Sequence, residues 1–208
     1  MFKSLLAVAV LAIASLAAPA QAQTTRVSLP DGQSSVLVTY VGQLRSFEGE
    51  SRKDFMLRTG AVMGAWTDET GLEMCSSLYG SPSGQLRVYL TTSHSMLGCA
   101  FADYNLPGWK SLDVTIHTHP SKPVASIKTK DRLFLMGPER NAAMGEFSPE
   151  KFSEIDFEGG EGYLVSLGKL RHFDGKRTVK VIGDLPVADP ETVAGMVRTF
   201  RKIVEAEK

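Results

Sequence analysis

The sequence has little of several features that mark special classes of protein. Its 208 residues include two cysteines and four histidines, and 23 lysine and arginine residues balance 23 aspartate and glutamate residues. This balance argues against a nucleic-acid-binding domain, which is usually basic. The chain lacks internal repeats and low-complexity tracts, and it is too short for a closed (β/α)₈ barrel of about 250 residues. A hydrophobic content of 43% is ordinary for one globular domain.

The N-terminal segment resembles a secretory signal peptide. Lys3 supplies a positive charge, residues 5–16 are almost entirely apolar, and Ala20-Gln21-Ala22 has the small-x-small form of a cleavage site. We therefore expect residues 1–22 to be removed and residues 23–208 to form a single periplasmic or secreted domain. The alternative is an uncleaved membrane anchor, for which the apolar run is short. No later run is long enough to span a bilayer, so stable membrane insertion is not expected after cleavage.

Cys75 and Cys99 are the two cysteines of the chain. In an exported protein a disulfide is the default state of such a pair. A catalytic thiol or a metal-binding pair is the alternative, but the two residues lack the C-x-x-C spacing of those sites. We therefore predict a Cys75–Cys99 disulfide.

Several segments rich in β-branched and aromatic residues, bounded by turn residues, predict strands. They are 34–41, 72–79, 86–92, 112–119, 162–167 and 178–182. The second and third of these are joined by the turn residues 80–84 and are expected to form a hairpin. Strands mixed with a few helices predict an α/β or α+β fold.

Two segments have helical periodicity. A helix is predicted from Asp54, although Gly60 and Gly64 weaken the pattern. A second helix begins after Asp189, a good N-cap, with Pro190 at its first position. Its apolar stripe, expected to pack on the sheet, consists of Val193, Met196, Val197, Phe200 and Ile203.

His117 and His119 are the most informative residues of the chain. They end a predicted strand immediately before Pro120, and residues at i and i+2 of a strand point to the same face. Two neutral imidazoles side by side are typical ligands of a metal ion. The alternative is a pair of structural or surface histidines.

Other common hydrolase and metal-site patterns do not fit this chain. After His119 the sequence reads Pro-Ser-Lys-Pro-Val, without the carboxylate that a cupin places there. The chain also has no His-Glu-x-x-His helix and no Gly-x-Ser-x-Gly nucleophile elbow.

The remaining pattern resembles the JAMM (MPN-plus) family of zinc metalloproteases. That family combines an upstream Glu with His-x-His-Pro and then Ser-x-x-Asp. Here Glu73 lies in a predicted strand, His117-Thr118-His119-Pro120 follows, and Ser153 and Asp156 form the Ser-x-x-Asp. The strand expected over 162–167 also resembles the strand that follows the site in bacterial JAMM-like domains. The resemblance implies a mixed β-sheet flanked by helices, the cytidine-deaminase-like JAB/MPN fold.

The resemblance also implies a mechanism. His117, His119 and Asp156 would hold one Zn²⁺ and leave the fourth position to water, whose pKa zinc lowers. Glu73 would be the general base, and Ser153 would donate a hydrogen bond to the tetrahedral oxyanion. The expected reaction is hydrolysis of a peptide or isopeptide bond in a protein, a peptide or a cell-wall peptide.

Two points stay open at the level of sequence. Asp131 is an alternative third ligand, whereas Ser148 is disfavoured because Lys151 stands where its carboxylate would be. The Ser-x-x-Asp lies further from the His pair than is usual in the family, so residues 121–151 are expected to be an insertion over the site.

The alternative function is a non-catalytic exported JAB-like domain that acts as a binding or interaction module.

Overall fold

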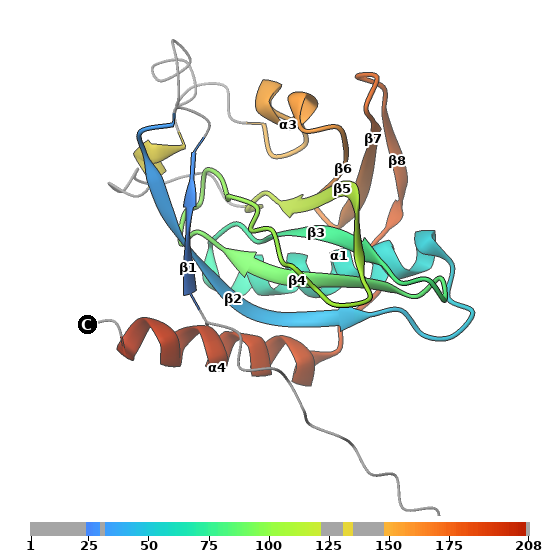
Figure 1. Cartoon of the computed structure of the whole chain (residues 1–208), viewed down its shortest axis with the longest axis horizontal. Coiled ribbons are helices and arrows are strands. Elements are labelled where there is room, and N and C mark those ends of the chain that lie inside the picture. Colours follow the sequence, from blue (N-terminus) through green and yellow to red (C-terminus); the bar gives the residue numbers. More distant parts are fainter. Residues whose placement is uncertain (1–23, 30–31, 122–130, 135–147, 207–208) are drawn as a thin grey trace, which may run out of the picture.

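The computed structural model describes residues 24–29, 32–121, 131–134 and 148–206 (Figure 1). This part of the chain has a mixed α+β fold, with one eight-stranded sheet and three α-helices. None of the helices in the described ranges is long and apolar enough to cross a membrane. The predicted signal peptide and most of the predicted insertion at 121–151 lie outside the described residues.

The strands pair in an order that differs from their order in the chain. The sheet runs β1-β2-β4-β3-β5-β6-β7-β8, and its neighbours are antiparallel except for β5 and β6, which are parallel. Their bounds are β1 Thr24–Ser28, β2 Ser35–Arg45, β3 Cys75–Gly80, β4 Leu86–Thr92, β5 Lys110–Thr118, β6 Glu161–Ser166, β7 Lys169–Asp174 and β8 Val179–Asp184. A parallel pair needs a crossover connection, which here contains the short helix α3 (Glu154–Glu158).

The main core lies between one face of the sheet and two long helices, α1 (Arg52–Thr70) and α4 (Pro190–Ala206). Alternate residues of β5 and β6 point into this core, including Ile116 and Val165. From α4, the buried stripe is Met196, Val197, Phe200 and Ile203. The C-terminal helix is therefore confirmed, and its stripe packs on the sheet as predicted.

Helix α1 contains two glycines because it lies very close to the sheet. A Cβ atom on Gly60 would be 3.0 Å from Leu185 and 3.1 Å from Val165, and one on Gly64 would be 3.2 Å from Val165. The close packing explains glycines that would otherwise lower helix stability by about 1 kcal/mol each. Ser51 caps the N-terminus of α1, and Gly71 ends the helix in the left-handed conformation.

The opposite face of the sheet is covered by the β4–β5 connection and by the region of α3. Ala100 and Ala102 of that connection pack on β2, while Phe152 and Phe157 pack on Leu164 of β6 and on Phe173 of β7. In Figure 1, α3 lies on one side of the sheet and α4 on the other. The two faces of β5 consequently have different environments, a packed core on one side and the candidate site on the other.

The predicted hairpin, the strands around the His pair and both long helices are confirmed. The structure adds β1, β7 and α3, which the sequence analysis did not predict. Glu73 was expected within a strand, but β3 begins two residues later, at Cys75. The backbone N–H of Glu73 nevertheless donates to Ser95 O at 2.8 Å, so the segment before β3 is held beside the sheet.

Candidate metal centre

Strand β5 brings the two histidines together at its carboxyl end. His117 lies in the strand and His119 immediately beyond it; their ring centroids are 5.0 Å apart. The backbone N–H of His119 donates to Val165 O at 3.0 Å, which extends the parallel pairing with β6 by one more step. His117 packs edge-on against Phe152, with ring centroids 5.9 Å apart.

Asp156 reaches the histidines from α3, and a capping box fixes its position. The backbone N–H and the hydroxyl of Ser153 both donate to Asp156 Oδ2, each at 2.7 Å. The other carboxylate oxygen, Oδ1, lies 3.6 Å from His117 Nε2. Burial by itself raises the pKa of Asp156, but the neighbouring His117 and the hydrogen bonds from Ser153 outweigh it, and the pKa is lowered overall.

The three side chains converge as ligands of a metal ion do. One ligand atom from each of His117, His119 and Asp156 lies within 4.8 Å of the others. The 3.6 Å between His117 Nε2 and Asp156 Oδ1 is long for a hydrogen bond. It is close to the ~3.4 Å that separates two ligands bonded to a tetrahedral Zn²⁺ at about 2.0–2.2 Å. His117 Nε2 is also buried without a hydrogen-bond partner, so a metal ion would satisfy it.

His119 is oriented through its other ring nitrogen. Its Nδ1 lies 3.1 Å from Pro149 O, and a carbonyl oxygen can only accept, so Nδ1 carries the proton and Nε2 keeps its lone pair. The segment that supplies this carbonyl is anchored by Glu150, which accepts from the buried Arg171 of β7 at 2.7 Å. Pro149 and Arg171 could not be predicted as part of the site, because neither a backbone carbonyl nor a long-range ion pair leaves a signal in the sequence.

The pKa of His119 is lowered to about 3, mainly by burial and then by the nearby His117. At neutral pH its imidazole is therefore neutral, which is the form that binds a metal ion. No proton has to be removed from His119 before a cation is bound.

Glu73 lies beside the cluster without belonging to it. Its Oε1 is 3.9 Å from His119 Nε2, and the other ring nitrogen of His119 is the one directed to Pro149 O. The next residue, Met74, is hydrogen-bonded to Thr118 at the end of β5. Its N–H donates to Thr118 Oγ1 at 2.9 Å, and its carbonyl accepts from Thr118 N at 3.0 Å. The hydroxyl of Thr118 lies 2.7 Å from that of Thr67 on α1. Hydrogen bonds therefore connect α1, the end of β5 and the segment that carries Glu73.

The pKa of Glu73 is raised well above its ordinary value. The largest cause is burial, followed by repulsion from the carboxylates of Asp156 and Asp131. Only 3% of the Glu73 side chain is exposed. A carboxyl group with a raised pKa is well suited to accept and return a proton near neutral pH.

Asp131, the alternative third ligand, has a different position. Its Oδ1 accepts from Ser95 Oγ at 2.7 Å and from Met96 N at 2.9 Å. Among the described residues, the group of converging ligand atoms contains Asp156 and does not contain Asp131. Asp131 is buried close to Glu73 and holds the β4–β5 connection in place.

Ser153 is near the cluster, but its hydroxyl proton is already engaged. The hydroxyl donates to Asp156 Oδ2 and accepts from Asp156 N at 3.3 Å. A serine hydroxyl has a single proton, so in this arrangement Ser153 orients a ligand. Its predicted role as an oxyanion donor requires that hydrogen bond to be exchanged during the reaction and stays a prediction.

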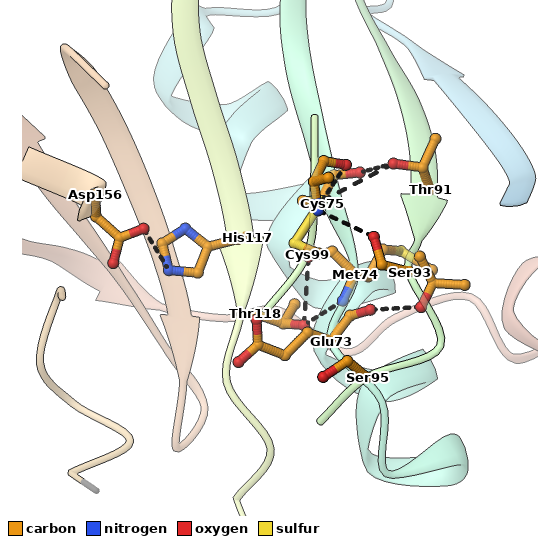
Figure 2. The surroundings of a disulfide bond; sticks show 12 residues. Glu73, Met74, Cys75, Thr91, Ser93, Ser95, Cys99, His117, Thr118 and Asp156 are labelled. Carbon is orange, nitrogen blue, oxygen red and sulfur yellow. Dashed lines mark hydrogen bonds and ion pairs between the residues drawn. A yellow bond between two sulfur atoms is a disulfide. The ribbon is translucent and has the colours of Figure 1, made fainter. Parts of the chain in front are cut away.

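The predicted disulfide between Cys75 and Cys99 is present. Cys75 is the direct partner of His117 in the pairing of β3 with β5. Figure 2 shows the imidazole of His117 directed toward Asp156, with the disulfide on the neighbouring strand. The bond ties the β4–β5 connection, which carries Ser95, to the strand beside the ligands.

The other two histidines lie away from this cluster. His94 lies 2.7 Å from Thr39 Oγ1 and contacts Phe200 of α4. His172 lies 2.8 Å from Glu161 Oε1. Both take part in contacts within the fold.

Comparison of the chain with protein-family models, with curated proteins and with solved structures finds no match. The structure directly supports one statement about this site: it is a buried His-His-Asp group that can hold a metal ion.

Proposed function

We propose that this protein is a zinc-dependent metallopeptidase of the JAMM type, which hydrolyses a peptide or isopeptide bond. The observation that carries the proposal is the position of Glu73, a buried carboxyl group 3.9 Å from the ligand nitrogen of His119. A metal-binding group needs only ligands. A metal-binding group with a proton acceptor beside it has the parts of a hydrolytic centre.

His117, His119 and Asp156 are the proposed ligands. Three protein ligands of this kind leave an open position, as catalytic zinc sites do. A zinc ion bound there would act as a Lewis acid and lower the pKa of a water molecule toward about 7. The buried, unpartnered Nε2 of His117 and the fixed tautomer of His119 support this ligand set.

Glu73 is the proposed general base and acid. Its carboxylate accepts the proton of the attacking water, and the protonated form returns that proton to the leaving amine. We propose two contributions for Ser153: its hydroxyl orients Asp156 directly, and release of that hydrogen bond would free the hydroxyl to donate to the oxyanion.

We also propose that the chain has the JAB/MPN fold. Its order of elements supports this proposal: Glu73 follows the long helix α1, the His pair ends the central strand β5, and Asp156 lies on the crossover to the parallel strand β6. The proposed setting is the periplasm or the cell exterior, with a protein, a peptide or a cell-wall peptide as substrate. The Cys75–Cys99 disulfide is compatible with that setting.

The first experiment measures zinc per chain by elemental analysis of the oxidised protein. We expect about one zinc in the parent and little in His117→Ala and in Asp156→Asn. Asp131→Asn is the matched control, because it removes the same charge from a neighbouring buried carboxylate, and it should keep its zinc. Loss of zinc in Asp131→Asn with retention in Asp156→Asn would reverse the assignment of the third ligand.

The second experiment tests hydrolysis with a library of internally quenched decapeptides. The zinc-loaded parent should cleave members of the library. Glu73→Gln should keep zinc and lose about 100-fold or more in turnover, the contribution typical of a positioned base. Full activity in Glu73→Gln would refute the role of the base. Bound zinc without hydrolysis of any peptide or isopeptide would favour a non-catalytic binding module.

A further inference from the structure

The segment 148–152, which leads into the cap of α3, contacts both histidine ligands. Pro149 O lies 3.1 Å from His119 Nδ1 and accepts its proton. The ring of Phe152 packs edge-on against His117, with ring centroids 5.9 Å apart. The position of this segment therefore affects the orientation of both imidazole rings.

A turn presents the carbonyl of Pro149. The N–H of Lys151 donates to Ser148 O at 3.1 Å and closes the turn. A single hydrogen bond within a turn does not fix its position relative to the sheet. The contacts of the turn with the neighbouring strands therefore decide where the carbonyl lies.

Arg171 of β7 lies in the same row of the sheet as His117. Leu164 of β6 pairs directly with His117 on one side and with Arg171 on the other. Directly paired residues project to the same face of a sheet, and two strand spacings amount to about 10 Å. The guanidinium of Arg171 is therefore on the face that carries the candidate metal centre.

The two ends of the Arg171 guanidinium hold different parts of the structure. Nη1 donates to Ser166 Oγ at 2.8 Å and to Ser166 O at 3.2 Å. Nη2 donates to Glu150 Oε1, in the turn, at 2.7 Å. The planar fork of arginine makes both sets of hydrogen bonds at once, so the turn is attached to the end of β6.

Burial makes this ion pair different from one on the surface. The side chain of Arg171 is 8% exposed, and within the described ranges Glu150 is the carboxylate that pairs with it. A buried cation is costly without an anionic partner, so Arg171 favours the position of the turn that brings Glu150 to it. The pair between Lys169 and Asp184, on the same strand, is 44% and 82% exposed and is of the weaker surface type.

We propose that Arg171 is a positioning residue for the candidate metal centre. By pairing with Glu150, it fixes the turn that presents the carbonyl of Pro149. That carbonyl keeps the proton of His119 on Nδ1, so Nε2 retains the lone pair that a metal ion needs. The inference rests on the ligand set of the proposed function and is independent of hydrolysis.

Two substitutions break the ion pair from opposite sides. Arg171→Met removes the charge and keeps most of the apolar length of the side chain. Glu150→Ala shortens a side chain that is 52% exposed, so little packing is lost, and it keeps the test open if Arg171→Met does not fold. Lys169→Met is the matched control, because it removes a cation from the same strand and breaks only the exposed pair with Asp184. Thermal unfolding shows which variants are folded.

The first readout is the tautomer of His119 in the metal-free, ¹⁵N-labelled protein at neutral pH. Long-range ¹H–¹⁵N correlation distinguishes a protonated ring nitrogen from an unprotonated one, and the variant His119→Gln assigns the signals. Nδ1 should carry the proton in the parent and in Lys169→Met. In Arg171→Met and in Glu150→Ala the ring should exchange between its two tautomers, so the two ¹⁵N shifts should move toward each other. A lower global stability alone would leave the tautomer of the folded protein unchanged.

The second readout is zinc affinity, measured by chelator competition. Residues that orient a ligand typically change metal affinity by about 10–100-fold, and we expect a loss of about tenfold in Arg171→Met and in Glu150→Ala. Because both residues act through one ion pair, the double variant should also lose about tenfold. Independent effects would multiply to about 100-fold, which would overturn the route through Glu150. Lys169→Met should stay within about twofold of the parent.

The inference is overturned if folded Arg171→Met and Glu150→Ala keep either the parent tautomer or the parent zinc affinity. The same readouts separate it from the proposed function. If tautomer and affinity both respond but no peptide is cleaved, the role of Arg171 stands and the hydrolytic proposal fails. If the parent binds no zinc, the proposed ligand set fails, and the tautomer decides whether Arg171 orients His119.

Discussion

Glu73 is a buried carboxyl group with two other carboxylates near it, and this environment gives its ionisation a cost in stability. Burial, Asp156 and Asp131 raise its pKa. In the unfolded chain the same group ionises at its ordinary pKa. At pH values above that pKa, ionisation of Glu73 lowers the free energy of the unfolded state more than that of the metal-free folded state. The free energy of unfolding therefore falls as pH rises.

Replacing Glu73 by Gln should therefore stabilise the metal-free protein at neutral and alkaline pH. The difference between Glu73→Gln and the parent should be near zero at about pH 4 and grow by up to about 1.4 kcal/mol for each pH unit above it. Urea unfolding in EDTA from pH 4 to pH 8 measures this difference. A constant difference across that range would show that Glu73 ionises normally. Added zinc should reduce the difference, because a nearby cation favours the carboxylate.

The histidine ligands could be predicted from their sequence, and the third ligand could be only partly predicted. His117 and His119 share a face because of the two-residue repeat of a strand, which is a local property. Asp131 and Asp156 are both acidic residues downstream of them, and only the tertiary fold separates their positions. Asp131 accepts from Ser95 of the β4–β5 connection, whereas Asp156 is directed to His117 by a helix cap.

Helix α3 has five residues, too few for helical periodicity to be recognised in a sequence. Isolated helices of this length are not stable in water, so α3 depends on its cap and on Phe157, which packs on Phe152 and Phe173. Strand β7 was missed because charged residues interrupt its apolar pattern. The six strands that were predicted and the two long helices, by contrast, have enough residues for a periodic signal.

Ser153→Ala should weaken zinc binding with little effect on the global fold. The substitution removes the cap of α3, worth about 1 kcal/mol, and the hydrogen bond that orients Asp156. We expect zinc affinity to fall by about 10–100-fold, as for other residues that orient a ligand. Chelator competition measures the affinity, and Ser153→Thr, which keeps the hydroxyl, is the control. An unchanged affinity in Ser153→Ala would mean that Asp156 does not need the cap.

On the scale of the whole molecule, the disulfide joins the β4–β5 connection to the central strands. Cys75 and Cys99 are separated by 24 residues, and closing a loop of that size stabilises a fold by about 3 kcal/mol in the chain-entropy description. The connection also supplies Ser95, which holds Asp131. The covalent link thus lies within the same region as the proposed proton acceptor.

Reduction should lower the free energy of unfolding by about 3 kcal/mol. Urea unfolding of the oxidised protein with and without TCEP measures the change. The double variant Cys75→Ala/Cys99→Ala should match the reduced protein and should not respond to TCEP. If TCEP destabilises that variant as well, the effect does not come from the disulfide.

The parallel pairing of β5 with β6 has a consequence for how this protein can be altered. The chain leaves the sheet after His119 and returns at Glu161, and both ends of that excursion are held by neighbouring strands. Doubling the length of a flexible loop costs only about 0.6 kcal/mol in closure entropy. Because both ends of the excursion are fixed by the sheet, a change in its length need not move the ligands, provided that Asp131 keeps its bond to Ser95 and Pro149 its contact with His119. A foreign segment inserted between Asp131 and Pro149 should therefore leave zinc binding intact, and the zinc content of the graft would measure whether it is tolerated.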